Sequence, residues 1–484
     1  MNFFINFTLI MLLSNMALLA NTKSAIKNNG QLIYNNTQKS VDTLPDFFKE
    51  GDFFARLRNN TFYFAYNTPD ASHETQLVSA IGASLIYRSA SLNGFSFNIG
   101  AYASHSFFDG SKLDNISHLK PSKDTLSRYK YVNGGSKSLY TFAQANVKYR
   151  YAHTDITLGR QLVETFYTKS NDTKMIPNAF DGLVLSSQDI PDSTLKLAYL
   201  AKQKLRDHQD AHSVLMVGDA NSTAGVNHPE WTQNDDSAMH KGLTYSALNA
   251  AGKSTDAPLI ILDAQNQSVK NLKINFSSYM VPELLSQAMG ELNYKLTFNG
   301  FSVSPGVRYI KQFDNGAGAV GGASLYNIGL SGYKDATSLD SQMIAARLVT
   351  KIQDYKINLA YTNILDESDL VTPWRGFPTG GYTRSMGMYN WRANTKSYRL
   401  ELVKGANDVG IYTTPFIQTS VLYINGDQNK ADTDSMFYYF GIIQNLPSMQ
   451  EFQYRFRFGY RDFIGDSSAI SSYIDSRLEF NYLF

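Results

Sequence analysis

The segment 452–461 constrains the fold more than any other part of the chain. Its residues alternate strictly between aromatic and polar or small side chains: Phe452, Tyr454, Phe456, Phe458 and Tyr460 are interleaved with Gln453, Arg455, Arg457, Gly459 and Arg461. A period of two predicts a β-strand with one aromatic and one charged face. Five aromatics on one face are too apolar for water, and arginines are too costly for a dry core. A strand between lipid and a wet lumen satisfies both faces. A soluble sandwich stays an alternative, and it would need aromatic inner faces throughout the chain.

The C-terminal residues follow the same pattern. Leu478, Phe480, Tyr482 and Phe484 alternate with Arg477, Glu479 and Asn481, so the chain ends on an aromatic residue of an amphipathic strand. Bacterial outer-membrane barrels commonly end this way, because the last strand closes the barrel and its end is read by the assembly machinery. We therefore expect outer-membrane lipid and the barrel-assembly machinery as partners.

Amphipathic strands recur along the whole chain, and they predict a transmembrane antiparallel β-barrel of about 18 strands. The mean hydropathy of −0.28 excludes a helical membrane protein, whereas 13% aromatic residues and no cysteine suit an exported barrel. The expected strands are 53–66, 76–88, 94–104, 139–151, 154–160, 180–187, 194–201, 257–263, 269–280, 286–298, 301–311, 341–351, 355–363, 395–403, 411–424, 434–444, 450–461 and 474–484.

The connections between these strands alternate in length. Residues 89–93, 152–153, 299–300, 353–354 and 446–449 are short, whereas 105–138, 202–256, 312–340 and 364–394 are long. Barrels of the outer membrane have short periplasmic turns and long external loops. The glycine-rich runs 316–322 and 376–387 are expected to be flexible external turns. The loop 202–256 is expected to be solvated, although His208 and His212 have the spacing of metal ligands on a helix.

The N-terminus predicts export. Residues 3–20 form an uncharged apolar stretch, and a cut after Ala20, or as late as Ala25, is expected for a signal peptide. The segment departs from a typical signal peptide in one respect, because no Lys or Arg precedes the apolar stretch. Residues 21–52 are then expected to be a periplasmic tail, and residues 53–484 the barrel in the cell outer membrane.

Residues 158–187, LGRQLVETFYTKSNDTKMIPNAFDGLVLSS, resemble the OprD family of substrate-specific outer-membrane porins. In that family a strand runs into a constriction loop and returns through a motif that here runs from Lys174 to Gly182. The segments ARLRN at 55–59 and LYINGD at 422–427 and the strand with Arg455, Arg457 and Arg461 agree with it. The resemblance implies an 18-stranded barrel in which each monomer forms one pore, with an inward-folded third external loop and a lumenal ladder of basic residues. The long loop 202–256 and Lys174, where Arg is commoner, depart from the family.

Candidate pore residues follow from strand parity and from the family. Basic side chains that line a narrow wet path favour anions over cations, and Arg grips carboxylates in a bidentate manner. The candidates for pore lining and selectivity are Arg56, Arg58, Arg150, Arg455, Arg457 and Arg461. The alternative is that they pair with carboxylates such as Glu479 and brace the wall. The candidates for the constriction loop are Tyr167, Lys169, Asn171, Asp172 and Lys174.

The functional prediction is a porin for passive diffusion of small hydrophilic solutes, biased toward anions or carboxylates. A net charge of +2 gives no reason to expect nucleic-acid binding. No motif of a serine hydrolase, a zinc protease or a cysteine nucleophile is present, so we expect neither an enzyme nor a cofactor. The alternative is an adhesin-like barrel that acts through its external loops. An outer-membrane hydrolase would need a Ser/His or Asp/His contact at the membrane rim.

Overall fold

The computed structural model describes the chain except residues 1–23, 70–74, 110–124, 171–173, 216–239, 327–330, 373, 431 and 466–470. The expected signal peptide and the candidates Asn171 and Asp172 therefore lie outside the described residues. None of the described helices is long and apolar enough to cross a membrane.

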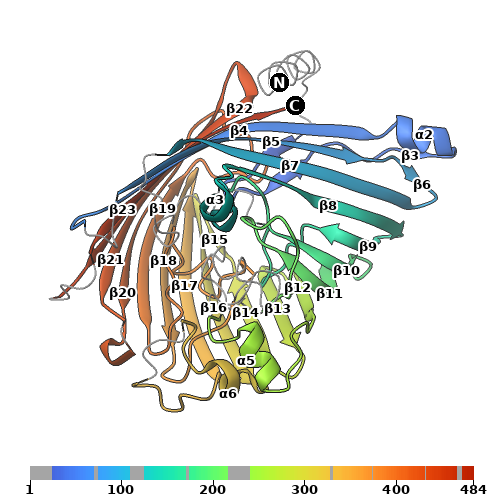
Figure 1. Cartoon of the computed structure of the whole chain (residues 1–484). Helices are drawn as coiled ribbons and strands as arrows, with labels where there is room; N and C mark the ends of the chain where they lie inside the picture. Colours follow the sequence, from blue (N-terminus) through green and yellow to red (C-terminus); the bar gives the residue numbers. More distant parts are fainter. Residues whose placement is uncertain are drawn as a thin grey trace.

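The described residues form a closed antiparallel barrel of 18 long strands (Figure 1). Each strand pairs with its neighbours in sequence, and β23 closes the barrel on β4, with Leu483 opposite Arg56. The strands are β4 (Asp52–Tyr66), β5 (Gln76–Arg88), β7 (Phe95–Asp109), β8 (Ser138–Tyr151), β9 (Thr154–Gln161), β10 (Ala179–Ser187), β11 (Ser193–Lys204), β12 (Leu259–Asn266), β13 (Leu272–Val281), β14 (Leu285–Tyr294), β16 (Phe301–Asp314), β17 (Ser341–Ile352), β18 (Tyr355–Ile364), β19 (Lys396–Lys404), β20 (Phe416–Asn425), β21 (Ser435–Leu446), β22 (Met449–Phe463) and β23 (Tyr473–Leu483). These confirm the strands expected from the alternation, with boundaries that differ by a few residues.

The alternation of the sequence places side chains on the two faces of the wall. In β19, Tyr398, Leu400 and Leu402 are exposed on the outside, whereas Arg399 and Glu401 are buried on the inside. β22 and β23 have the expected parity, since Gln453, Arg455, Glu479 and Asn481 are buried and the aromatic residues between them face outward. An apolar outer band and a polar inner face are what a barrel in lipid requires.

Short turns join the strands at one end of the barrel. Asn93 and Gly94, both with positive φ (51° and 84°), form the two-residue turn after the short strand β6 (Ser91–Leu92). Positive φ at both positions is the type I′ geometry, which matches the twist of a hairpin and favours Asn-Gly. β15 (Leu296–Phe298) extends β14 at the same end.

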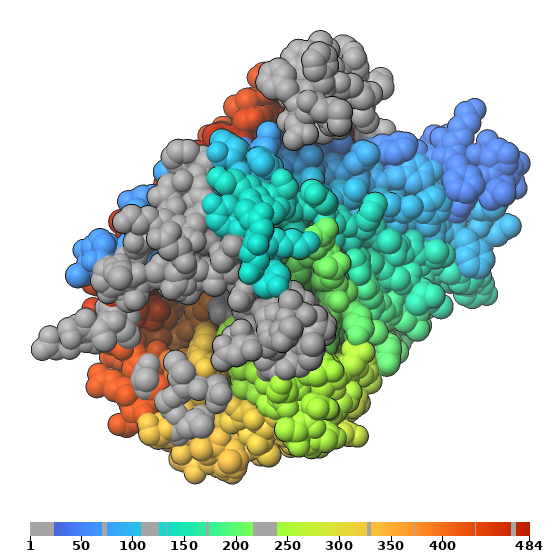
Figure 2. Space-filling view, in the orientation of Figure 1, coloured from blue at the N-terminus to red at the C-terminus, as the bar shows by residue number. Residues whose placement is uncertain are grey.

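Long connections lie at the other end, and they carry α3 (Arg128–Gly134), α5 (Tyr245–Ala250), α6 (Ala317–Gly321) and the short helix η4 (Gln428–Lys430). α5 and α6 lie against one another and cover part of this face (Figure 2). The expectation that residues 376–387 are an external turn was wrong, because the carbonyl groups of Pro378, Gly380 and Gly381 accept hydrogen bonds from lumenal arginines.

The described parts of the loop 202–256 are not a solvated external loop either. Val214, Leu243 and Leu248 are buried in one apolar cluster with Leu200 and Leu259, which are inward residues of the wall. The apolar side chains of the loop thus find partners inside the barrel, which the sequence pattern of the loop does not reveal. His208 and His212 are buried at a turn and a β-bridge rather than on a helix.

The N-terminal segment, expected as a tail over 21–52, is folded from residue 24 onward. β1 (Ser24–Ile26) pairs with β2 (Leu32–Tyr34), and β3 (Ser40–Val41) pairs in parallel with β6 at the short-turn end. α2 (Leu44–Lys49) follows, and its N-cap Thr43 accepts a hydrogen bond from the Asp46 N–H.

Candidate functional site

Two long connections fold into the lumen and hold each other there. We name residues 162–178 the first inner loop and residues 365–395 the second inner loop. The Lys169 N–H donates to the Trp374 carbonyl (3.0 Å), and the Gly376 N–H donates to the Tyr167 carbonyl (2.9 Å). A Cβ atom at Gly376 would lie 2.1 Å from the Phe166 carbonyl oxygen, so only glycine permits this approach. Two segments about 200 residues apart in sequence thus lie against each other inside the barrel.

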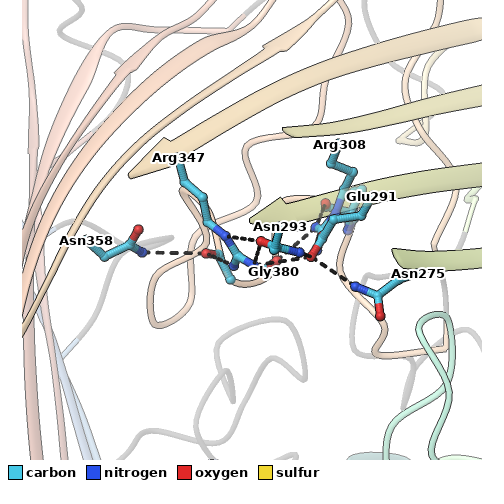
Figure 3. Close-up of polar contacts among 9 residues, drawn as sticks. Asn275, Glu291, Asn293, Arg308, Arg347, Asn358 and Gly380 are labelled. Atoms are coloured by element: carbon cyan, nitrogen blue, oxygen red, sulfur yellow. Dashed lines mark hydrogen bonds and ion pairs between the residues drawn. The ribbon is translucent and has the colours of Figure 1, made fainter. Parts of the chain in front are cut away.

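The second inner loop is held by arginines of the barrel wall (Figure 3). Arg308 of β16 donates to the Pro378 and Gly380 carbonyls (2.7 and 2.8 Å), and Arg347 of β17 donates to the Gly381 carbonyl (2.9 Å). The Tyr382 ring lies between the two guanidinium groups, with its centroid 4.5 Å from Arg308 and 4.6 Å from Arg347. Cation–π contacts with both arginines hold the ring in place.

Glu291 of β14 is the carboxylate at the centre of this network. It accepts hydrogen bonds from Arg308 Nε (2.6 Å), Arg347 Nη2 (3.2 Å), Asn293 Nδ2 (2.7 Å) and Asn275 Nδ2 (3.3 Å), as Figure 3 shows. A buried carboxylate with four donors is satisfied, and it balances part of the positive charge around it.

A cavity of about 550 Å³ lies beside this network, and we name it the Arg384 chamber. Five basic and two acidic side chains line it, so its fixed charge is positive. The basic residues are Lys273, Arg347, Lys356, Arg384 and Arg399, and the acidic residues are Glu291 and Glu401. Glu401 forms an ion pair with Arg399 and lies 3.6 Å from Lys356.

Arg384 differs from the other arginines of this chamber. Its guanidinium stacks on Phe377, 4.3 Å from the ring centroid, and its Nε and Nη1 atoms have no hydrogen-bond partner among the described residues. Arginine stays charged in proteins. The group therefore contributes positive charge to the chamber wall, whereas its Nε and Nη1 atoms are buried away from the chamber.

A second cavity of about 380 Å³ shares Lys273, Asn275 and Glu291 with the first, and we name it the Glu164 chamber. Its charges are nearly balanced, with four basic and three acidic side chains. These are Lys169, Lys196, Lys273 and Arg308, and Glu164, Asp263 and Glu291. The first inner loop supplies Glu164 and Lys169 to the lining of this chamber.

The predicted residues of the first inner loop have different surroundings. Tyr167 is fully buried against Tyr279, 4.7 Å between ring centroids, so it packs the loop rather than facing solute. Lys169 lies 3.6 Å from Glu164 and faces the chamber. Lys174 is buried over the Phe62 ring, and its carbonyl accepts a hydrogen bond from Arg58.

The predicted wall arginines are not brought together in one site. Arg56 and Arg58 are buried on the inner face of β4, and Arg58 holds the return of the first inner loop. Arg150 lies at the exposed short-turn rim and pairs with Asp155 (2.6 Å).

The three arginines of β22 face inward, each with its own partner. Arg455 donates to the Lys27 carbonyl, Arg457 forms an ion pair with Glu479, and Arg461 donates to Ser435 Oγ (3.2 Å). The pairing of Arg457 with Glu479 is the wall-bracing alternative that the sequence left open.

The sequence analysis missed Arg308, Arg347, Arg384 and Arg399. Three of them carried a signal, because Arg308, Arg347 and Arg399 each stand between outward apolar neighbours in strands that were correctly predicted. Arg384 gave no such signal, since its place depends on the inward fold of a loop.

Metal ligation finds no support among the described residues, where no group of three or more His, Asp or Glu side chains is arranged to hold an ion. The rings of His208 and His212 lie 4.8 Å apart, and the His212 Nδ1 atom lies 2.7 Å from the Ser213 carbonyl oxygen.

Comparison with solved structures shows the same fold in several porins. OpdK of Pseudomonas aeruginosa is 12% identical, with a TM-score of 0.66 over 90% of this chain and 99% of its own. OccAB3 of Acinetobacter baumannii is 15% identical, with a TM-score of 0.68 over 90% of this chain and 100% of its own. OccK8 (OprE) of Pseudomonas aeruginosa is 14% identical, with a TM-score of 0.67 over 90% and 99%. One of the OpdK structures was determined with vanillate.

Comparison by sequence gives a family assignment. No curated protein matches the chain. The profile described as "outer membrane porin, OprD family" matches residues 45–459, most of the chain and nearly all of the barrel. With its 18-stranded barrel and inward-folded loops, the chain belongs to the OprD family of outer-membrane porins.

Proposed function

We propose that this porin lets small hydrophilic solutes diffuse passively across the outer membrane and favours anions, carboxylates in particular. The Arg384 chamber has five basic and two acidic side chains inside a low-dielectric wall. A narrow path with such lining lowers the electrostatic barrier for an anion and raises it for a cation.

The observation that carries the proposal is the guanidinium of Arg384. It lies on the chamber wall and has no ion pair with a carboxylate among the described residues, whereas Arg347 pairs with Glu291 and Arg399 with Glu401. A planar guanidinium binds a carboxylate through two parallel hydrogen bonds. A carboxylate in the chamber would supply the negative counter-charge that Arg384 lacks among the described residues.

The crystallised complex of OpdK with vanillate, an aromatic carboxylate, supports the same class of solute. In this chain Phe377, Tyr389 and Trp391 lie around Arg384, at 4.3, 5.6 and 5.9 Å from its guanidinium carbon to the ring centroids. A carboxylate with an apolar body would therefore meet both a charged group and aromatic surface.

The rival function, an adhesin-like barrel, needs loops displayed outward for a partner. The second inner loop and the described parts of 202–256 instead bury apolar residues inside the barrel, among them Trp374, Val214 and Leu243. Loops that fold inward shape a solute path rather than an outer binding face. Their inward fold therefore favours the porin.

The test is ion selectivity in planar bilayers. Reversal potentials in a salt gradient should show a preference for anions, and Arg384→Gln should shift the reversal potential toward cation selectivity. The matched control is Lys270→Gln, which removes one positive charge from the exposed turn between β12 and β13. Equal selectivity of the Arg384→Gln variant and the parent protein would reject the anion site. Absence of conductance from the folded parent protein would reject the channel function itself.

A further inference from the structure

The hairpin formed by β1 and β2, residues 24–34, is attached to the lumenal side of the barrel at three points. Arg455 donates hydrogen bonds to the Lys27 and Asn28 carbonyls, and Gln453 Nε2 donates to the Ile26 carbonyl (3.2 Å). On the connection between β19 and β20, the Tyr412 hydroxyl accepts a hydrogen bond from the Asn28 N–H (2.9 Å). Arg455 and Gln453 are inward residues of β22, so the hairpin lies inside the barrel.

The first strand of the hairpin is packed rather than solvated. Ser24, Ala25 and Ile26 are 3%, 1% and 2% exposed. Gly410, with φ +79°, lies so close that a Cβ atom there would be 3.1 Å from the Ile26 carbonyl carbon and the Lys27 nitrogen. Such burial shows that the first strand packs against the barrel, as a loosely attached tail would not.

The second strand packs against the neighbouring part of the wall, beyond β23. The Tyr34 ring lies 4.3 Å from the Phe54 ring of β4, and the guanidinium carbon of Arg88 lies 5.0 Å from the Tyr34 centroid. The hairpin therefore lies along the inside of the wall formed by the consecutive strands β22, β23, β4 and β5, where the barrel closes.

The turn of the hairpin faces the solute path. Asn29 and Gln31 line the Glu164 chamber, opposite Lys196, Asp263 and Arg308 of the wall. Asn28 and Asn29 are exposed although they lie within the barrel, so their side chains contact the water of the lumen. The chamber has polar amides on this side and charged groups on the other sides.

We propose that the N-terminal hairpin is part of the pore, and that Asn29 and Gln31 determine which solutes pass the Glu164 chamber. This inference rests on the proposed channel function and adds a specificity element that the barrel wall and the inner loops do not supply. Arg455 acts as its anchor and not as a group that binds solute. A charge placed at position 29 would alter the nearly balanced field of the chamber.

The experiment uses the absence of cysteine from the chain, which leaves no background reaction. The full-length Asn29→Cys variant is reconstituted in planar bilayers and treated with methanethiosulfonate reagents that carry a sulfonate or a trimethylammonium group. The control is Thr37→Cys, which lies in the same segment but at the exposed short-turn rim, next to the hydrogen bond from Gln38 to Ser89.

Modification of the Asn29→Cys variant should cause a stepwise loss of single-channel conductance, and the two reagents should shift the reversal potential in opposite directions. The Thr37→Cys variant should be modified without either effect. Mass spectrometry measures the extent of modification. Full modification at position 29 with unchanged conductance and reversal potential would overturn the proposal, and so would failure of the reagents to react there. If the variant conducts normally and either of these two outcomes is found, only the role of the hairpin is rejected. If the parent protein does not conduct, the proposed channel function is rejected.

Discussion

The guanidinium of Arg457 and the carboxylate of Glu479 form an ion pair across β22 and β23, on the inner face of the barrel wall. Their backbones are not directly opposite, because Glu479 faces Arg455 and Arg457 faces Arg477 in the register. Glu479 therefore reaches diagonally to Arg457, while Arg455 is left to hold the N-terminal hairpin. Two arginines of the same strand and the same parity thus have different roles.

We predict that Arg457→Gln destabilises the barrel more than it alters selectivity. The substitution leaves Glu479, only 1% exposed, without its cation. Removal of one partner of a buried ion pair costs about 3–5 kcal/mol. The midpoint of unfolding, followed by heat-modifiable gel mobility, should fall, and the double variant Arg457→Gln with Glu479→Gln should recover part of the loss. An unchanged midpoint with a large change in selectivity would assign Arg457 to the solute path instead.

Glu291→Gln should make the channel more selective for anions, opposite in sign to Arg384→Gln. Glu291 lines both chambers, and its substitution removes one of the two acidic groups of the Arg384 chamber. The substitution destabilises the buried pair with Arg308, but Arg308 keeps its hydrogen bonds to the Pro378 and Gly380 carbonyls, so the barrel should stay folded. Reversal potentials of the two variants in the same salt gradient check the prediction, and shifts of equal sign would contradict it.

Acid should loosen the contact between the loop at His240 and the segment around α6. Burial lowers the pKa of His240 to about 4, from an ordinary value of 6.5. The neutral ring donates from Nε2 to the Gly322 carbonyl (2.9 Å) and accepts at Nδ1 from the Gly242 N–H (3.1 Å). Because the unfolded loop binds a proton below pH 6.5 and the folded loop does not, the contact is most stable above pH 6.5 and weakens as the pH falls toward 4.

Between pH 7 and pH 5 the expected loss is about 2 kcal/mol of local stability. Hydrogen exchange at residues 240–243, corrected for the intrinsic pH dependence of exchange, measures it. His240→Gln keeps a donor but does not titrate, so its exchange should lose this pH dependence. Equal opening free energies of the parent protein at both pH values would show that the ring is not neutral and buried in solution.

The mature chain should begin at Asn21 rather than at Ile26. Ala20 and Ala25 each lie at the end of a segment that is suited to signal-peptide cleavage. Cleavage after Ala25, however, would remove two of the three residues of β1. Mass spectrometry of the purified outer-membrane protein reads the N-terminus directly. A start at Ile26 would leave β2 without its partner strand and would contradict the proposed hairpin.

Deletion of Phe484 should reduce the yield of folded barrel. The Phe484 N–H donates to the Ala55 carbonyl of β4 (2.9 Å), and its ring packs on Tyr482, so this residue completes the seam between the last strand and the first. Heat-modifiable mobility and yield in outer membranes compare the deletion with Phe484→Tyr, which keeps an aromatic end. Unchanged yield of the deletion variant would show that the terminal residue is dispensable for assembly.

The strands could be predicted from the sequence because the side-chain pattern of each strand depends only on its immediate surroundings. Alternation in β19 or β22 requires no knowledge of the rest of the chain, since lipid lies on one side and water on the other. Inward parity of Arg455 and Arg457 followed in the same way. Their partners did not, because the choice between Lys27 and Glu479 depends on strand register and on a segment more than 400 residues away.

The inner loops could be predicted only in part. The resemblance placed the first inner loop in the lumen, and its Lys169 does face a chamber. The second inner loop has a glycine-rich sequence that is typical of an exposed turn, and it is held inward by Arg308 and Arg347 on the adjacent strands β16 and β17. A local sequence pattern does not indicate such a contact. Arg384 could therefore not be predicted, because its position depends on the inward fold of this loop.

The manner in which Arg308 and Arg347 hold the second inner loop leaves its side chains open to change. Both arginines bind backbone carbonyl oxygens, of Pro378, Gly380 and Gly381, and every amino acid supplies a carbonyl. Neighbouring side chains such as that of Arg384 can therefore be exchanged while the loop keeps its course. The solute preference can therefore diverge, or be redesigned, through substitutions at positions such as 384, whereas Gly376 and Tyr382 are constrained because they take part in holding the loop.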